Sequence, residues 1–203
     1  MFQTLKSGGP IMIPIIVCGI IATFIIIERC IYFYNVKKRD GKLVADLQGA
    51  LAAGNFEACA VACAHADTPT SQVVKKAVEC RNYNENDLRE AVESEMSIVV
   101  PRYEHLLTAL GTISNIATLL GLLGTVTGNI KAFGVLGAGG SMGDPALLAG
   151  AIAEALVTTV AGLCVSIPSV IFHNYFVSQV NHRIIEMEAN VTSILLRLTG
   201  RVR

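Results

Sequence analysis

Charge is scarce in this chain, and neither sign predominates. Asp, Glu, Lys and Arg together make up 16% of the 203 residues, and 16 basic side chains are balanced by 16 acidic ones. A chain without a basic surplus has no field that attracts nucleic-acid phosphates, so we expect no nucleic-acid partner. Hydrophobic residues account for 52% of the chain and the mean hydropathy is +0.54, which is too apolar for a soluble domain. The composition indicates a membrane protein in contact with lipids.

Cysteine is sparse as well. Six cysteines in 203 residues are too few for a secreted scaffold held together by disulfides. Cys59 and Cys63 stand close to His65, which is the composition of a metal site. Their spacing is not that of a zinc knuckle, the surrounding alanines are typical of a packing face, and no second ligand pair follows. We therefore expect no metal and no cofactor.

Catalytic signatures are missing too. The chain contains no Gly-x-Ser-x-Gly elbow, no phosphate loop and no paired nucleophile and base. The glycine-rich run at 137–143 lacks the lysine and hydroxyl residue of a phosphate loop, and it is typical of a flexible connector. The sequence predicts a protein that is not an enzyme.

Three apolar runs are long enough to cross a bilayer, which takes about 20 residues. They span residues 11–34, 106–131 and 146–172. A cleaved signal peptide is the alternative for the first run, but that run has no strongly charged start and no small-residue cleavage site before Glu28. We predict an all-α membrane protein with three transmembrane helices.

The basic residues predict the orientation of these helices. Only Lys6 precedes the first run, whereas Lys37, Lys38, Arg39 and Lys42 follow it, so we expect the N-terminus outside the cytoplasm. The predicted topology places residues 1–10 outside, 35–105 in the cytoplasm, 132–145 in an external periplasmic loop and 173–203 in the cytoplasm. Arg183, Arg197, Arg201 and Arg203 agree with that assignment. Lys131, at the outer end of the second run, is the one discordant charge.

The region at 35–105 is predicted to be helical. It carries nine basic and eleven acidic residues, a mixture typical of solvated helices. Breaks are expected at Gly54 and at Thr68, and acidic residues open a new helix at Glu85. That helix has no obvious stop before the second run apart from Pro101, and the apolar spacing of the third run continues beyond residue 174. Helices two and three are therefore predicted to extend into a cytoplasmic helical stalk.

Small and polar residues recur along one face of the second transmembrane helix. They are Gly111, Ser114, Asn115, Thr118, Gly121, Thr125, Gly128 and Asn129. Tight helix packing is one explanation, because Gly124 and Gly128 form a Gly-x-x-x-Gly pair. The other explanation is the wall of a hydrated ion path. This helix alone does not decide between them.

Glu154 favours the second explanation. It lies about 12 Å into a hydrocarbon core about 30 Å thick, where a carboxyl group is costly and usually functional. Thr158 and Thr159 lie one turn further on, followed by the small residues Ala161, Gly162 and Ser166. Desolvation favours the neutral carboxyl, which can then exchange a proton. The alternative is a structural glutamate that bonds to a neighbouring helix or lies at the interface because the span begins later.

Two segments carry a resemblance to a known family. IATLLGLLGTVTGNIKAF at 116–133 and IAEALVTTVAGLCVSIPSVIFHNYF at 152–176 resemble the MotA/TolQ/ExbB proton-channel family, in its TolQ/ExbB branch. The resemblance implies a bacterial inner-membrane pentamer around two copies of a single-span TolR/ExbD-like partner, with protons as the coupling ion. A TonB- or TolA-like protein would receive the work, for envelope uptake or envelope maintenance. A passive membrane scaffold and a small-solute transporter stay open as alternatives.

The resemblance also assigns roles to residues. It places Thr125 and Thr159 on the proton path and makes Glu154 the family's glutamate of helix three. We add Thr158 and Thr118 to the path from their positions, and we assign helix packing to Gly121, Gly124, Gly128, Gly162 and Pro168. The family usually has proline where this chain has Thr118, so helix two is expected to be straighter here.

Overall fold

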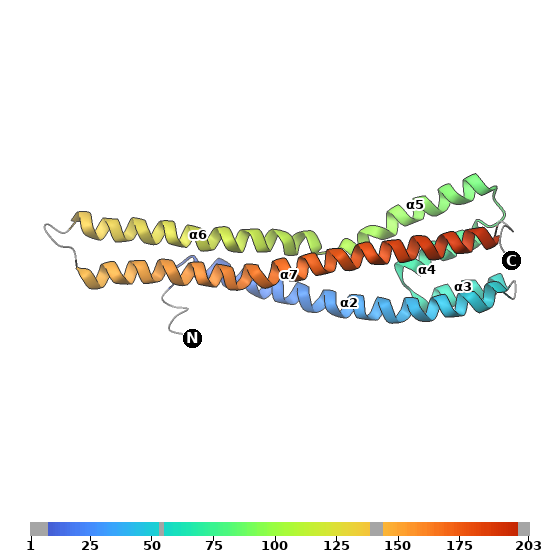
Figure 1. The fold of residues 1–203 in the computed structure, drawn as a ribbon, viewed down its shortest axis with the longest axis horizontal. Helices are drawn as coiled ribbons and strands as arrows, with labels where there is room; N and C mark the ends of the chain where they lie inside the picture. Colours follow the sequence, from blue (N-terminus) through green and yellow to red (C-terminus); the bar gives the residue numbers. More distant parts are fainter. Residues whose placement is uncertain (1–7, 53–54, 139–143, 199–203) are drawn as a thin grey trace. The chain divides into compact units, whose positions relative to one another are not determined.

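The computed structural model describes residues 8–52, 55–138 and 144–198. In chain order the helices of this part are α2 (Met12–Ala52), α3 (Phe56–Ala66), α4 (Pro69–Glu79), α5 (Glu85–Glu104), α6 (Leu107–Ala138) and α7 (Pro145–Leu198) (Figure 1). The described residues contain no strand. Three stretches, within α2, the α5–α6 region and α7, are long and apolar enough to cross a membrane. The all-α fold with three candidate spans is thus confirmed.

Some predictions concern residues outside the described ranges. These are Lys6 and residues 1–7 of the predicted external N-terminus, positions 139–143 of the glycine-rich connector, and the C-terminal Arg201 and Arg203.

The chain divides into two compact units. Unit 1 consists of residues Met1–Glu28 and Leu106–Tyr175, and unit 2 of Arg29–His105 and Phe176–Arg203. Helices α2 and α7 each have one part in unit 1 and the other part in unit 2. The borders of the transmembrane segments stay predictions.

Unit 1 contains α6, the first part of α2 and the first part of α7. Helices α6 and α7 lie side by side and run in opposite directions (Figure 1). On α2, Gly19 lies against the side chain of Val165 of α7. Large apolar side chains point away from the unit, among them Phe24, Leu119 and Leu156. Such side chains suit contact with lipid or with another apolar protein surface.

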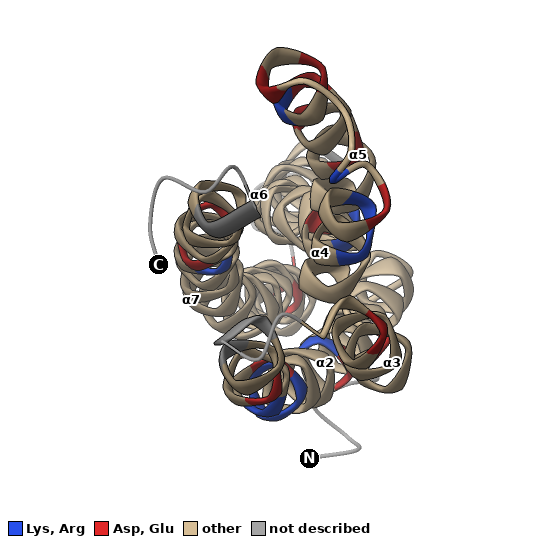
Figure 2. Ribbon diagram, turned by 90° about the vertical axis from the view of Figure 1, so that its right-hand side faces the viewer, with Lys and Arg blue, Asp and Glu red and all other residues tan. Residues whose placement is uncertain are grey.

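Unit 2 is built from shorter helices whose starts follow local sequence signals. Asn55 caps α3 by accepting a hydrogen bond from the Ala58 amide, and Asn84 caps α5 in the same way from Asp87. Thr68 and Ser71 form a capping box at the start of α4. Figure 2 shows basic residues on α4 and both acidic and basic residues on α5. The predicted break at Thr68 and the predicted helix start at Glu85 are confirmed. Gly54, where another break was predicted, lies outside the described residues, between the end of α2 at Ala52 and the start of α3 at Phe56.

One prediction about the stalk is wrong. We expected the helix that begins at Glu85 to continue into the second transmembrane helix, but α5 ends at Glu104 and α6 begins at Leu107. Leu106 has a left-handed backbone with φ of +65°, which interrupts the helical hydrogen bonds. Pro101 lies inside α5 and does not end it. Helix α7, in contrast, continues without interruption to Leu198, as predicted for the third helix.

Candidate functional site

The contact between α6 and α7 in unit 1, here called the seam, brings together most of the predicted site residues. Glycines bring the two backbones close together. A Cβ atom on Gly162 would meet the Ala117 carbonyl oxygen at 2.6 Å, and one on Gly128 would meet the Ala155 Cβ at 2.5 Å. A Cβ on Gly121 would lie 3.3 Å from the Thr159 Cα. The seam therefore leaves no room for side chains at these positions.

Hydroxyl groups and one imidazole link the two helices across the seam. Thr159 donates to the Gly121 carbonyl at 3.0 Å. Thr118 donates to the Ser166 hydroxyl at 2.7 Å, and Ser114 lies 3.2 Å from the same hydroxyl. Thr159, Ser166 and His173 of α7, which bond to hydroxyl or carbonyl groups of α6, follow at intervals of seven residues. This interval is the repeat of side chains at a left-handed helix–helix contact.

His173 closes this series at one end of the seam. Its Nδ1 lies 3.0 Å from the Leu107 carbonyl oxygen. Because a carbonyl oxygen only accepts, Nδ1 carries the proton in this hydrogen bond. Gly111 makes the space, since a Cβ there would lie 3.0 Å from the His173 Cε1. His173 was not among the residues predicted from the sequence, although its spacing of two heptads from Thr159 is a signal that could have identified it.

Glu154 lies near the other end of the seam. Its Oε1 accepts a hydrogen bond from the Lys131 Nζ of α6 at 2.7 Å. The Glu154 side chain is 26% exposed and the Lys131 side chain 52% exposed. The same carboxylate lies against Gly9, just before α2. From the sequence, Lys131 was only a charge that disagreed with the predicted orientation of the helices. The structure shows that it forms an ion pair with Glu154.

The predicted path threonines do not all lie in one place. Thr158 is buried against Gly124, where its hydroxyl donates to the Ala155 carbonyl at 2.7 Å. Thr125 donates to the Leu122 carbonyl of its own helix at 2.6 Å. Along α7, Thr158 and Thr159 follow Glu154 by about one turn. Thr118 belongs instead to the cluster around Ser166.

The polar stripe of α6 divides between two environments. Ser114, Gly121, Gly124 and Gly128 are buried in the seam, whereas Asn115 and Asn129 are exposed. The buried members pack against α7, as the packing explanation predicts, and the wall of an ion path stays a prediction.

Pro168 lies inside α7 on an exposed side. Its ring nitrogen has no hydrogen to donate to the carbonyl one turn earlier. The helix nevertheless continues through it, and the neighbouring Ser169 hydroxyl donates to the Val165 carbonyl at 2.7 Å. The seam residues do not include Pro168.

Cys59 and Cys63 lie on α3 in unit 2, where both are buried free thiols. Burial raises the pKa of Cys59, and burial together with the neighbouring Cys59 raises the pKa of Cys63 to about 11. Both groups are therefore held as neutral thiols near pH 7, and a thiol must lose its proton to bind a metal. Within the part of the chain that the structure describes, no three His, Cys, Asp or Glu residues form a possible metal site.

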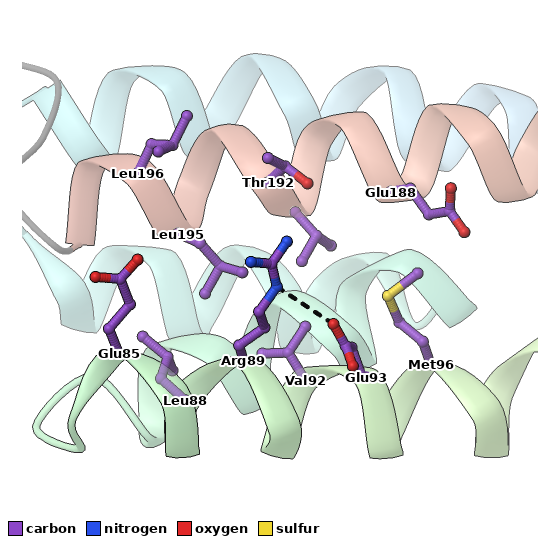
Figure 3. Close-up of a pocket in the computed structure, with 11 residues that line it drawn as sticks. Glu85, Leu88, Arg89, Val92, Glu93, Met96, Glu188, Thr192, Leu195 and Leu196 are labelled. Atoms are coloured by element: carbon purple, nitrogen blue, oxygen red, sulfur yellow. Dashed lines mark ion pairs between the residues drawn. The ribbon is translucent and has the colours of Figure 1, made fainter.

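Unit 2 also contains a hollow of about 500 Å³ between α5 and the end of α7 (Figure 3). Arg89 and Glu93 form an ion pair of 3.3 Å at its surface. Its apolar lining includes Leu88, Val92, Met96, Val191 and Leu195. The predicted site residues are not among those that line it, so we do not assign the function to this hollow.

Comparison with known proteins identifies the family of this chain. The sequence profile of the MotA/TolQ/ExbB proton channel family matches residues 65–189, which include all of α6 and the part of α7 that carries Glu154. The chain is similar to the biopolymer transport protein ExbB of Neisseria meningitidis, with 31% identity over 189 residues that cover 84% of each chain. It is also similar to ExbB of Xanthomonas campestris, with 41% identity over 98 residues that cover 48% of this chain and 36% of that protein.

These matches extend far beyond the two segments that carried the resemblance. The family consists of channel subunits rather than enzymes, and this protein is accordingly not an enzyme. Its three apolar helices make it a membrane protein. The chain therefore belongs to the MotA/TolQ/ExbB proton channel family, on its ExbB-like branch.

Proposed function

We propose that this chain is the proton-channel and stator subunit of a motor in the bacterial inner membrane. In this proposal five copies enclose two copies of a single-span TolR/ExbD-like partner, with the N-terminus outside and the C-terminus in the cytoplasm. The motor uses the proton gradient to energise an envelope process through a TonB- or TolA-like protein. No covalent chemistry is required of the chain.

The observation that carries this proposal is the position of Glu154. Its carboxylate lies in an apolar stretch of α7, partly exposed, with Thr158 and Thr159 on the next turn. A carboxyl group in a membrane segment is costly and is usually found on an ion path. The family match supports a proton as the ion.

The proposed mechanism converts a gradient into movement. A proton that crosses the membrane releases about 2.3 kcal/mol per 100 mV. Transient neutralisation of a carboxylate on the partner changes its contacts with one subunit of the ring. Because five subunits and two partner chains cannot match in symmetry, each protonation shifts the contact to the next subunit.

Proton flux tests the role of Glu154. The complex with its partner is reconstituted in vesicles that hold a pH-sensitive dye, and a potential is imposed. We expect Glu154→Gln to abolish flux, whereas Glu90→Gln, which changes an exposed carboxylate on α5, leaves it unchanged. Thr159→Val should slow the flux. Normal flux in both the Glu154→Gln and Thr159→Val variants would refute the roles assigned to these residues. A separate measurement with a sodium gradient in place of the proton gradient tests the coupling ion.

Native mass spectrometry tests the architecture. The detergent-extracted chain is measured alone and after co-expression with single-span candidates from the same cell. Five copies that retain two copies of a partner would support the motor, and co-purification of a TonB-like or a TolA-like protein would assign the process. A monomer or dimer without a partner would contradict the proposal.

A passive membrane scaffold is the second candidate, and the seam favours it in one respect. The hydroxyls of Thr118, Thr158 and Thr159 all form hydrogen bonds within one subunit, as a purely structural role requires. A scaffold does not need the carboxyl of Glu154. Full activity of a Glu154→Leu variant in the cell would favour the scaffold over the channel.

A further inference from the structure

We infer that Lys131 is the internal counter-ion of Glu154: its ammonium group pairs with the carboxylate in the resting subunit and must release it before Glu154 accepts a proton. This inference rests on the proposed function, in which Glu154 carries protons. It assigns Lys131 a positioning role that neither the sequence nor the family match provides.

The register of the seam creates the pair. Gly128 packs against Ala155, and a Cβ at Gly128 would also lie 3.0 Å from the Ala151 carbonyl oxygen. Lys131 follows Gly128 by about one turn on α6, and Glu154 directly precedes Ala155 on α7. Because the helices run in opposite directions, the two side chains meet on the same side of this contact. The glycine contact therefore determines which cation Glu154 meets.

The surroundings of Glu154 provide one compensating charge. Helix α6 contributes Lys131, the segment before α2 contributes Gly9, which has no side chain, and α7 contributes the neutral Thr158 one turn on. In the ranges 8–52, 55–138 and 144–198, Lys131 is the one cation in an ion pair with Glu154. A carboxylate in an apolar span is costly, and a cation at 2.7 Å is the group that compensates its charge.

The exposure of the two groups indicates how the pair opens. Lys131 is twice as exposed as Glu154, and its long, flexible side chain can turn toward water while the shorter glutamate stays in place. In the predicted topology this end of the seam faces the outside, which is the side from which protons arrive. Movement of Lys131 therefore controls access of the proton to Glu154.

Carbodiimide labelling tests the inference without relying on transport. A hydrophobic carbodiimide reacts with protonated carboxyl groups, and mass spectrometry of the intact complex and its peptides measures the adduct at Glu154. We expect Lys131→Met to raise the labelling rate at neutral pH, since the carboxyl group of Glu154 then lacks the ammonium group that pairs with it. Lys131→Arg keeps the cation and should label at the rate of the unaltered protein. Equal rates in the unaltered protein and in Lys131→Met would overturn the inference.

A reciprocal measurement covers the case in which Lys131→Met does not assemble. Acylating reagents attack neutral amines, so a lysine that loses its carboxylate partner should react faster. We expect Glu154→Gln to raise the acylation rate of Lys131, with the exposed Lys42 of the same chain as the internal reference. An unchanged ratio of Lys131 to Lys42 acylation would contradict the pairing.

Proton flux separates a failure of this inference from a failure of the proposed function. If both hold, Lys131→Met changes the pH dependence of flux and Lys131→Arg restores it. If Glu154→Gln conducts normally while the two labelling experiments show the pair, the proposed function fails and the counter-ion assignment stands. If Glu154→Gln blocks flux while Lys131→Met changes neither labelling nor the pH dependence, the proposed function stands and this inference fails.

Discussion

Units 1 and 2 share helices α2 and α7 but are held together by different contacts. In unit 1 the backbones of α6 and α7 approach over Gly121, Gly128 and Gly162, and hydroxyl groups cross the gap. In unit 2 the interior is filled by large side chains such as Tyr103 and Phe176, whose exposed fractions are both 0%.

The difference follows from the surroundings that each unit is predicted to have. In lipid, burial of apolar side chains gains little, so close packing of small residues and interhelical hydrogen bonds must hold helices together. In water, removal of large apolar surfaces stabilises the fold by about 25 cal/mol per Å². One helix, α7, thus carries two different packing patterns along its length.

Unit 2 contains a buried carboxyl group, that of Asp40, which is bonded to hydroxyl groups. Asp40 is buried, and its Oδ2 accepts a hydrogen bond from Thr70 at 3.2 Å, while the Thr70 hydroxyl lies 3.3 Å from that of Tyr103. Burial raises the pKa of Asp40, although hydrogen bonds from Thr68 and Thr70 and the charge of Arg183 act in the opposite direction. Burial also raises the pKa of Tyr103.

The largest effect is expected from a side chain placed in the seam. Gly162→Val forces a Cβ toward the backbone of Ala117 and Gly121, and we expect a loss of about 3 kcal/mol of stability through overpacking. Thermal melting in detergent, followed by circular dichroism, measures it. Gly150→Val is the matched control on α7, because a Cβ there meets nothing within 4 Å. Equal melting of the two variants would show that glycine packing does not hold unit 1 together.

The next effect concerns the pH dependence of unit 2. Since the folded-state pKa of Asp40 lies above its ordinary value of 3.8, the stabilising contribution of its proton is complete below about pH 3.8 and is lost as the pH rises through the folded value. We expect the melting temperature of the unaltered chain to fall, relative to that of Asp40→Asn, as the pH rises from about 4 toward neutrality. Asp46→Asn, an exposed position on the same helix, should follow the unaltered chain. If the melting temperatures of Asp40→Asn and the unaltered chain change with pH in parallel, the pKa of Asp40 is not raised in the folded chain.

A smaller effect is expected from one hydroxyl bridge of the seam. Thr118→Val removes the donor to Ser166 but keeps the shape of the side chain, so we expect a loss of about 0.6 to 1.7 kcal/mol. Thr127→Val is the control, because that hydroxyl bonds only to carbonyls of its own helix, at 3.0 and 3.1 Å. If unfolding in mixed micelles gives the same free energy for both variants, the bridge contributes nothing to helix association.

The smallest effect is expected at the exposed ion pair of the hollow in unit 2. The side chains of Arg89 and Glu93 are 71% and 68% exposed, so Arg89→Ala should cost about 0.3 to 0.5 kcal/mol at low salt and less at high salt. Melting at two salt concentrations measures it. A loss well above 1 kcal/mol that persists in high salt would mean that Arg89 packs in the hollow rather than forming a solvated pair.

The helix starts of unit 2 could be predicted because their signals are local. Asn55, Thr68 and Asn84 bond to amides only three residues away, so a short stretch of sequence contains both partners. The end of α5 could not be predicted in this way. Leucine has no preference for a left-handed backbone, and nothing near Leu106 in the sequence marks the break.

The site could be predicted only in part. Glu154 stood out because a charge in an apolar run is visible in one dimension, and Gly124 and Gly128 stood out by their spacing. The partners could not be identified, because Lys131 and Glu154 are 23 residues apart and Ser114 and Ser166 are 52 apart. Those contacts depend on how two antiparallel helices align, and a shift of one residue would separate each pair.

The sequence by itself determined the class of this protein: an all-α membrane chain with three apolar stretches, a carboxyl group within the third of them and the pattern of a proton-channel family. These properties follow from composition and spacing, which act along a single helix. The tertiary structure alone decided which groups meet across the seam, where α5 ends, and that Glu154 is paired with Lys131. The register between two helices depends on the shapes of both contacting surfaces. The sequence pattern of one helix describes only the surface of that helix.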